Sequence, residues 1–109
     1  MNQIQKFATD DVRIKVEVLN ASGQRGWARL ATFALRDAGF DVVRYGNDPP
    51  PHQDTTVVIA RSGRDDWAQL VARALGGARI ESRPDTSRYL DVTVLLGSTW
   101  RPPSKPFHP

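Results

Sequence analysis

The nine residues SGQRGWARL, Ser22–Leu30, are followed forty residues later by a near copy, SGRDDWAQL, Ser62–Leu70. The two copies share serine, glycine, tryptophan, alanine and leucine positions, and the agreement continues into the Ala-Leu pairs at 34–35 and 74–75. Apolar residues at helical spacing usually line a core. We therefore interpret the internal repeat as a duplicated folding unit rather than a duplicated binding loop.

Each copy lies between two segments that read as β-strands. Before the first copy, Val12, Ile14, Val16 and Val18 alternate with polar residues, which is typical of a strand buried on one face. Its other face carries Arg13, Lys15 and Glu17 and is expected to face solvent. Further strands are expected at FDVVRY (40–45), TVVIA (56–60) and DVTVLLG (91–97), with a weaker one at ARIES (78–82).

The copies themselves begin two helices, expected at residues 26–38 and 65–75. Gly39 and the glycines at 76–77 are expected to end these helices, and Phe40 is placed to make the hydrophobic contact of the first C-cap. Ser62 is the candidate N-cap of the second helix, where two aspartates follow at 65–66.

Two β-α-β units in series predict an α+β two-layer sandwich. Its core is a ferredoxin-like β-α-β-β-α-β arrangement with an additional strand. Both helices are expected on one face of a sheet of four to five strands, with ARIES at an edge. The expected division is a polar lead-in or linker at 1–11, one domain at 12–98 and a proline-rich tail at 99–109.

Composition limits the function classes. A chain of 109 residues without cysteine fits one domain that has no disulfide and no thiolate zinc site. A net charge of +3, mostly from arginine, gives a mildly basic surface, weaker than that of a committed nucleic-acid binder. No apolar run approaches the ~20 residues of a membrane span, and no secretory signal opens the sequence. An anchor or export signal would therefore lie outside this sequence.

Catalytic and metal sites are not indicated. His52 and His108 both lie beside prolines and lack metal-ligand spacing. A triad could be drawn from Ser22, His52 and Asp54, but no Gly-x-Ser-x-Gly turn presents a nucleophile. We expect no enzyme activity, no metal and no cofactor.

The turn NASGQRG (20–26) is the candidate binding element. It joins a strand to a helix start, where backbone N–H groups and the helix dipole favour anions. It matches neither a Walker loop nor Gly-x-Gly-x-x-Gly, so a purely structural tight turn is the alternative. The second copy has two aspartates where the first has Arg25 and Gly26, so an anionic polymer should contact the first. The candidate ligand-binding residues are Asn20, Ser22, Gly23, Arg25 and Arg29.

The tryptophans have two interpretations. Trp27 and Trp67 lie on apolar stripes and are expected in the core, whereas Trp100 is the freer candidate for stacking on sugars or bases. RNA-binding sheets present aromatics on their central strands, and neither the polar face of 12–18 nor TVVIA has one. Nucleic acid is therefore not expected as a partner.

The segments VEVLNASGQRGWARLATFALRDAGFDVVRYGN (16–47), TTVVIARSG (55–63) and DVTVLLG (91–97) together resemble the LytR C-terminal domain, LytR_C. The resemblance covers roughly residues 12–98. The sequence departs from the family pattern at Ala21, Ser22 and Trp27. The matching positions look structural: Asn20, Gly23, Gly26, Gly39, Phe40, Gly46, Asn47 and Gly97.

The resemblance implies a non-catalytic domain outside the bacterial cytoplasmic membrane. Such domains follow a membrane anchor, often behind a LytR-CpsA-Psr domain that ligates glycopolymers to peptidoglycan. We therefore expect an extracytoplasmic accessory domain that binds cell-wall polymer (peptidoglycan or an anionic glycopolymer) or an envelope protein. The first alternative is a protein-interaction or dimerisation module with no polymer binding, for example a homodimer paired through an edge strand such as ARIES (78–82). The second is a nucleic-acid or nucleotide binder.

Overall fold

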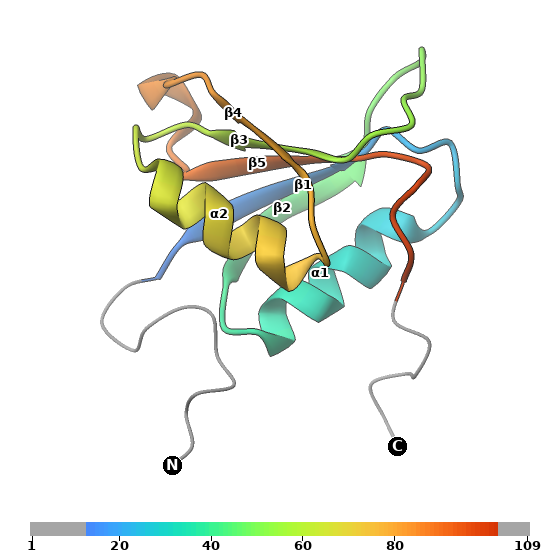
Figure 1. Cartoon of the computed structure of the whole chain (residues 1–109), viewed down its shortest axis with the longest axis horizontal. Coiled ribbons are helices and arrows are strands. Elements are labelled where there is room, and N and C mark those ends of the chain that lie inside the picture. Colours follow the sequence, from blue (N-terminus) through green and yellow to red (C-terminus); the bar gives the residue numbers. More distant parts are fainter. Residues whose placement is uncertain (1–12, 103–109) are drawn as a thin grey trace.

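The computed structural model describes residues 13–102 as a sheet layer with a helix layer (Figure 1). Along the chain the elements are β1 (Lys15–Asn20), α1 (Trp27–Asp37), β2 (Asp41–Asn47), β3 (Val57–Ala60), α2 (Asp65–Ala74), β4 (Arg79–Ser82), the 3-10 turn η2 (Thr86–Arg88) and β5 (Val92–Leu96). The α+β two-layer prediction is confirmed. The expected lead-in at 1–11 and the tail beyond residue 102 lie outside the described residues.

The five strands form one mixed sheet in the order β2-β1-β5-β3-β4. β1 runs parallel to β2 and β5, and β3 runs parallel to β4 but antiparallel to β5. The expected edge position of ARIES is confirmed, because β4 ends the sheet. The ferredoxin-like description holds for the order of elements along the chain but only roughly for the sheet. Each β-α-β unit keeps its own strands adjacent, and β5 lies between the units.

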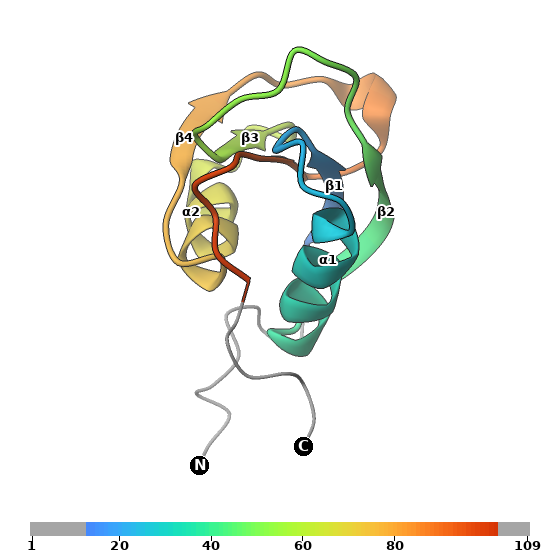
Figure 2. The same cartoon turned by 90° about the vertical axis from the view of Figure 1, so that its right-hand side faces the viewer.

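Both helices cover the same concave face of the sheet (Figure 2). The alternation of the first strand explains this face, because Ile14, Val16 and Val18 are buried against the helices. Trp27 and Trp67 pack against the same core, as predicted. β5 occupies the middle of the sheet because its apolar residues can be buried on both faces.

The structure agrees with the glycine prediction at the C-terminal end of α1 but not with the serine prediction at the N-terminal end of α2. After α1, Gly39 has φ +100°, and the Phe40 N–H donates to the Leu35 carbonyl at 3.0 Å, which is the Schellman pattern. The Ser62 cap prediction is wrong: α2 has Arg64 at its N-cap and no side-chain cap bond. The left-handed turn at Gly63, with φ +83°, separates Ser62 from the helix start.

Trp100 is not free, contrary to the sequence expectation. Its ring is buried and meets the Trp27 ring edge to face, with centroids 5.5 Å apart. The Trp100 N–H donates to the Gly97 carbonyl at 3.2 Å, and this turn folds the indole back onto the core. A side chain at Gly97 would collide with the Asp54 carbonyl, so glycine permits the close passage of these two segments.

Candidate functional site

Three of the five predicted ligand-binding residues meet at one hollow beside the start of α1. This first-turn hollow has a volume of about 300 Å³. Its lining comprises Asn20, Gly23, Gln24, Arg25, Asn47, Asp48 and His52. It lies at the carboxyl ends of the parallel strands β1 and β2, where loops of α/β folds commonly form ligand sites. Ser22 and Arg29 are not part of its lining.

Asn20 and Ser22 hold the turn together. The Asn20 Nδ2 donates to the Gln24 carbonyl at 2.7 Å, and its Oδ1 accepts from the Ser22 N–H and hydroxyl at 3.1 and 2.5 Å. The Ser22 Oγ in turn accepts from the Gln24 N–H at 2.9 Å. These bonds use the polar atoms of both side chains and explain why the turn needs them. Asn20 lines the hollow, and Ser22 supports it through the bonds within the turn.

The proline-rich loop that contains His52 packs against the turn at Gly23. It has φ +81°, and a Cβ there would stand 2.9 Å from Nδ1 of His52. Backbone bonds fix the loop over the end of β1: the Gln53 N–H donates to the Ala21 carbonyl at 2.7 Å and the Asp48 N–H to the Asn20 carbonyl at 3.0 Å. The imidazole therefore forms one wall of the hollow.

Arg25 is the unpaired positive charge at this site, and Asp48 supplies the one carboxylate of the lining. Its exposed guanidinium makes no ion pair or hydrogen bond within residues 13–102. The first turn of α1 contains no acidic residue, whereas α2 starts with Asp65 and Asp66. The positive end of the α1 dipole is thus left open, next to a free arginine. Arg29 lies further along α1, with its guanidinium 5.5 Å from the Phe33 ring.

The structure also contains a buried charged group that the sequence analysis placed in solvent. Glu17 points to the sheet face opposite the helices, as predicted, but it is buried instead of exposed. Its Oε1 accepts two bonds from Arg44, at 2.9 and 2.6 Å, and its Oε2 accepts from Arg88 at 3.1 Å and from the Thr93 hydroxyl at 2.9 Å. We call these four residues and Arg61, which donates to Thr93 at 3.0 Å, the Glu17 cluster.

Glu17 acts as a fixed anion within this cluster. Burial raises the pKa of Glu17, but hydrogen bonds from Arg44 and Thr93 and the charges of Arg44 and Arg88 outweigh it. The pKa therefore lies below its usual 4.5, and the carboxylate stays ionised at neutral pH. Only Arg44, on the neighbouring predicted strand, could have been suspected as a partner. Arg88 and Thr93 lie 71 and 76 residues away along the chain.

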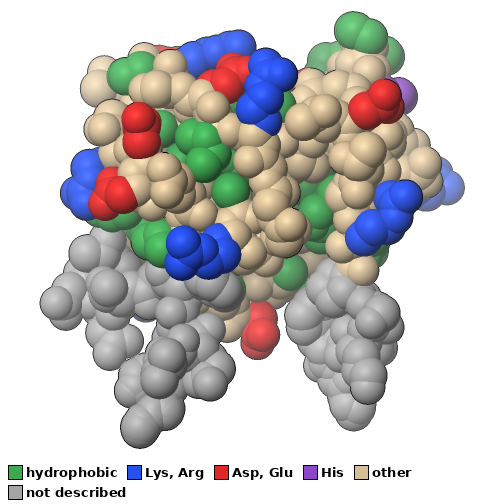
Figure 3. All heavy atoms as spheres, viewed as in Figure 1, with side chains coloured by type: hydrophobic (Ala, Val, Ile, Leu, Met, Phe, Trp, Pro, Cys, Tyr) green, Lys and Arg blue, Asp and Glu red, His purple; other side chains and the backbone are tan. Residues whose placement is uncertain are grey.

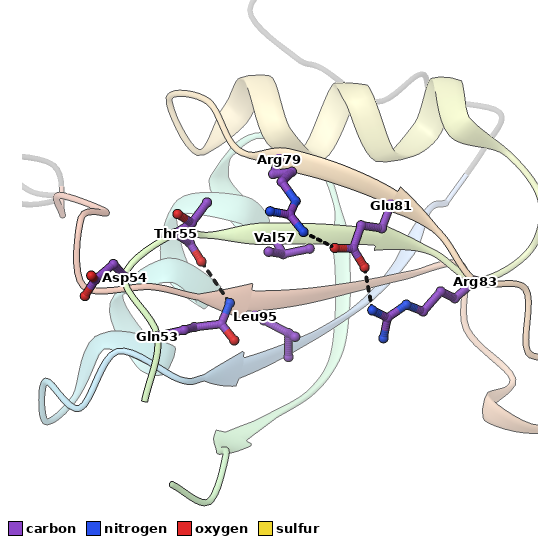
Figure 4. A pocket seen from close by; sticks show the side chains of 8 residues that line it. All are labelled: Gln53, Asp54, Thr55, Val57, Arg79, Glu81, Arg83 and Leu95. Carbon is purple, nitrogen blue, oxygen red and sulfur yellow. Dashed lines mark hydrogen bonds and ion pairs between the residues drawn. The ribbon is translucent and has the colours of Figure 1, made fainter. Parts of the chain in front are cut away.

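A further hollow of about 330 Å³ lies on the same open face, near edge strand β4 (Figure 4). Val57 and Leu95 contribute its apolar surface. Along the edge, Glu81 bridges Arg79 at 2.9 Å and Arg83 at 2.7 Å. One carboxylate thus bridges both arginines along this edge.

On the face that Figure 3 shows, the charged side chains of the described residues are mixed in sign. Figure 3 shows Lys and Arg side chains spread over one face, with carboxylates between them. Within the described residues, no group of three or more His, Cys, Asp or Glu side chains could hold a metal ion. No helix of residues 13–102 is long and apolar enough to cross a bilayer.

Comparison with known proteins identifies a family whose model matches this sequence. The family model LytR_C, described as LytR cell envelope-related transcriptional attenuator, matches residues 13–100. The chain is similar to the soluble domain of a conserved hypothetical secreted protein, the Rv2700 ortholog of Mycobacterium marinum. The identity is 28% and the TM-score 0.60, over 81% of this chain and 61% of that one.

A second similar structure is the C-terminal domain of the protein RV0431. The identity is 34% and the TM-score 0.52, over 78% of this chain and 72% of that one. The chain thus spans less than two thirds of the mycobacterial secreted domain. No curated protein matches it.

Proposed function

Because the chain belongs to the LytR_C family, we propose that it is a non-catalytic accessory domain of a bacterial cell-envelope protein. The secreted nature of the Mycobacterium marinum protein supports a place outside the cytoplasmic membrane. Membrane attachment, in this proposal, comes from an anchor outside the present sequence. The domain binds an anionic cell-wall polymer, either peptidoglycan or a glycopolymer attached to it.

One observation carries the polymer proposal: Arg25, whose guanidinium is unpaired within residues 13–102, lines the hollow two residues before α1 begins. A phosphate or carboxylate of a polymer would gain a charged hydrogen bond from this guanidinium. The other lining groups include Gln24, Asn47 and His52, whose side chains can form hydrogen bonds with sugar hydroxyls. Asp48 is the single carboxylate in the lining and limits how close an anion can come on its side.

Retention of the domain on purified wall material tests the proposal. The unmodified domain should bind sacculi that carry anionic polymer at low salt, and salt should weaken this binding. Arg25→Gln should reduce retention several-fold. Arg73→Gln is the matched control, because Arg73 is an exposed arginine in the last turn of α2 and its loss changes net charge equally.

Two results would count against the proposal. No retention of the unmodified domain on any wall material would reject polymer binding. Equal losses for Arg25→Gln and Arg73→Gln would reject the first-turn hollow as the site and leave only the effect of net charge.

Pairing with a second chain is the alternative function, and one observation favours it. Edge strand β2 carries Val43 and Tyr45, each about half exposed. Exposed apolar residues on a sheet edge suit strand addition, whereas β4 bears Arg79 and Glu81, which oppose it. Light scattering at high protein concentration tests this alternative, and a strict monomer would reject it.

A further inference from the structure

The loop between β4 and β5 contains a strained aromatic residue. Tyr89 follows the turn η2 and has φ +57°, the one positive φ among non-glycine residues of the described chain. Its side chain is 85% exposed, so the ring gains almost nothing from burial. Such a backbone costs about 1 kcal/mol for an L-residue, and glycine or asparagine would remove most of this cost. The fold thus holds a large ring in solvent at an energetic disadvantage.

Tyr89 borders a hollow of about 360 Å³ at the amino end of β1. Leu90 is buried and provides apolar surface, and Lys15 and Arg61 bring two positive charges. The one carboxylate in the lining, Asp91, accepts a hydrogen bond from the Lys15 backbone N–H at 2.9 Å. The Lys15 ammonium has no partner within residues 13–102.

Arg61 is the second, independent sign of a ligand. Its residue is only 9% exposed, yet its guanidinium contacts no carboxylate within the described residues. The Nε donates to the Thr93 hydroxyl and Nη1 to the Arg83 carbonyl at 3.2 Å, which leaves further N–H groups unused. Burial and the nearby charge of Arg88 lower the pKa of Arg61, while the charges of Asp85 and Glu17 act in the opposite direction. An anion in the hollow would add to the partial compensation that these two carboxylates give.

We propose that this Tyr89 hollow binds an acidic sugar, a hexose-type ring that carries a carboxylate or a phosphate. The C–H face of the sugar packs on the Tyr89 ring, and the acidic group meets Arg61 and Lys15. The hydroxyls of Ser62 and Thr86, also in the lining, are available for sugar hydroxyls. The biological source of the sugar rests on the proposed function, since an acidic sugar is a unit of an anionic wall polymer.

A sugar fits this hollow better than a nucleotide does, because Tyr89 is the one aromatic ring that the lining offers. Residues 13–102 provide no second aromatic wall in this lining that would sandwich a base. A sugar needs one apolar face and polar groups around its rim, which Tyr89, Leu90 and the two hydroxyls supply. Tighter binding of a nucleotide than of an acidic sugar would therefore count against the proposal.

The experiment is an NMR titration of the ¹⁵N-labelled domain with paired small sugars. N-acetylmuramic acid is compared with N-acetylglucosamine, which lacks its carboxylate, and glucose 6-phosphate with glucose. We expect the acidic member of each pair to shift the resonances of residues 86–91 and the Arg61 Nε–H, with Kd on the order of 1 mM. The neutral members should bind at least about tenfold more weakly, which is the loss of one charged contact.

Variants separate binding from folding. Tyr89→Ala removes the ring and should abolish the shifts, whereas Tyr89→Phe should keep them. Tyr89→Gly should abolish binding and at the same time raise the melting temperature, because it removes the strain. Tyr45→Ala, which removes another exposed tyrosine on β2, should leave binding unchanged. Lys15→Gln should reduce the preference for acidic over neutral sugars.

Three results would overturn the inference: no shifts with any acidic sugar, equal affinity for acidic and neutral members, or tighter binding of adenosine monophosphate than of either acidic sugar. The proposed function fails separately. If monosaccharides do not bind while polymer retention depends on Arg25, the first-turn hollow stands and the Tyr89 hollow falls. If acidic sugars shift residues 86–91 while Arg25→Gln leaves polymer retention intact, the reverse holds.

Discussion

Replacing Glu17 by glutamine removes one negative charge from a buried position while almost keeping the shape of the side chain. The charge lies between Arg44 and Arg88, and Arg61 is linked to it through Thr93. Glutamine retains one acceptor oxygen, but its amide N–H₂ group faces guanidinium and hydroxyl donors. We expect a large loss of stability from this single exchange.

The size of the loss follows from burial. Removing one partner of a buried ion pair costs about 3–5 kcal/mol, because the other charge is left without compensation. Here the arginines can recover water, since the Arg44 side chain is 57% and the Arg88 side chain 36% exposed. The expected cost therefore falls to about 2–3 kcal/mol, within the range for breaking hydrogen bonds to buried charged groups.

Glu81→Gln is the matched control. Glu81 also pairs with two arginines, Arg79 and Arg83, but its side chain is 21% exposed and both partners are more than half exposed. Ion pairs with exposed arginines contribute little, so this variant should lose much less stability than Glu17→Gln. The comparison keeps residue type, charge change and number of arginines the same and varies burial.

Urea unfolding at pH 7 measures the difference. Both variants should unfold with an unchanged m-value, and the midpoint should move much further for Glu17→Gln. Equal midpoints for the two variants would refute the reasoning, because burial of the carboxylate would then have no energetic consequence. A Glu17→Gln variant as stable as the unmodified domain would refute it as well.

Three further predictions concern acid, glycine and tryptophan. The lowered pKa of Glu17 means that its contribution to stability is complete above its unfolded pKa near 4.5 and is lost as pH falls through the folded pKa. The unmodified domain should therefore lose more unfolding free energy than Glu17→Gln between about pH 6 and 3, and parallel curves would contradict this. Gly63→Ala should lower the free energy of unfolding by about 1 kcal/mol, because its φ is positive. Gly23→Ala should lower it further, because the new Cβ would also collide with His52. In a double-mutant cycle measured by urea unfolding, His52→Ala should remove this additional loss. Trp100→Ala should cost about 3–5 kcal/mol by the same measurement, and a loss below 1 kcal/mol would argue against its packing on Trp27.

The elements were predictable where a local pattern determines them. Alternation over 12–18 identified β1 and its core face, and the apolar spacing placed both helices within one residue of their observed ends. The matched glycines Gly23 and Gly63 have nearly equal φ angles, +81° and +83°. This agreement supports the interpretation of the internal repeat as a duplicated folding unit.

Features that depend on distant residues were not predictable. Alternation assigns Glu17 to a face but cannot show that Arg88 and Thr93, more than 70 residues away, will cover it. The order of the strands was open for the same reason, since several apolar segments were equally able to be central. Trp100 follows a strand and precedes prolines, so no periodic pattern indicated its burial. At the first-turn hollow, three of the residues predicted from the sequence, Asn20, Gly23 and Arg25, share one lining, but the sequence could not show that His52 would form its wall.

The position of β5 has a consequence for synthesis. β5 is the last strand within residues 13–102 and the middle strand of the sheet, bonded to β1 on one side and β3 on the other. Until residues 92–96 have left the ribosome, β1 and β3 each have an unpaired edge and the two β-α-β units have no strand to join them. The sheet of this domain therefore closes only when β5 arrives.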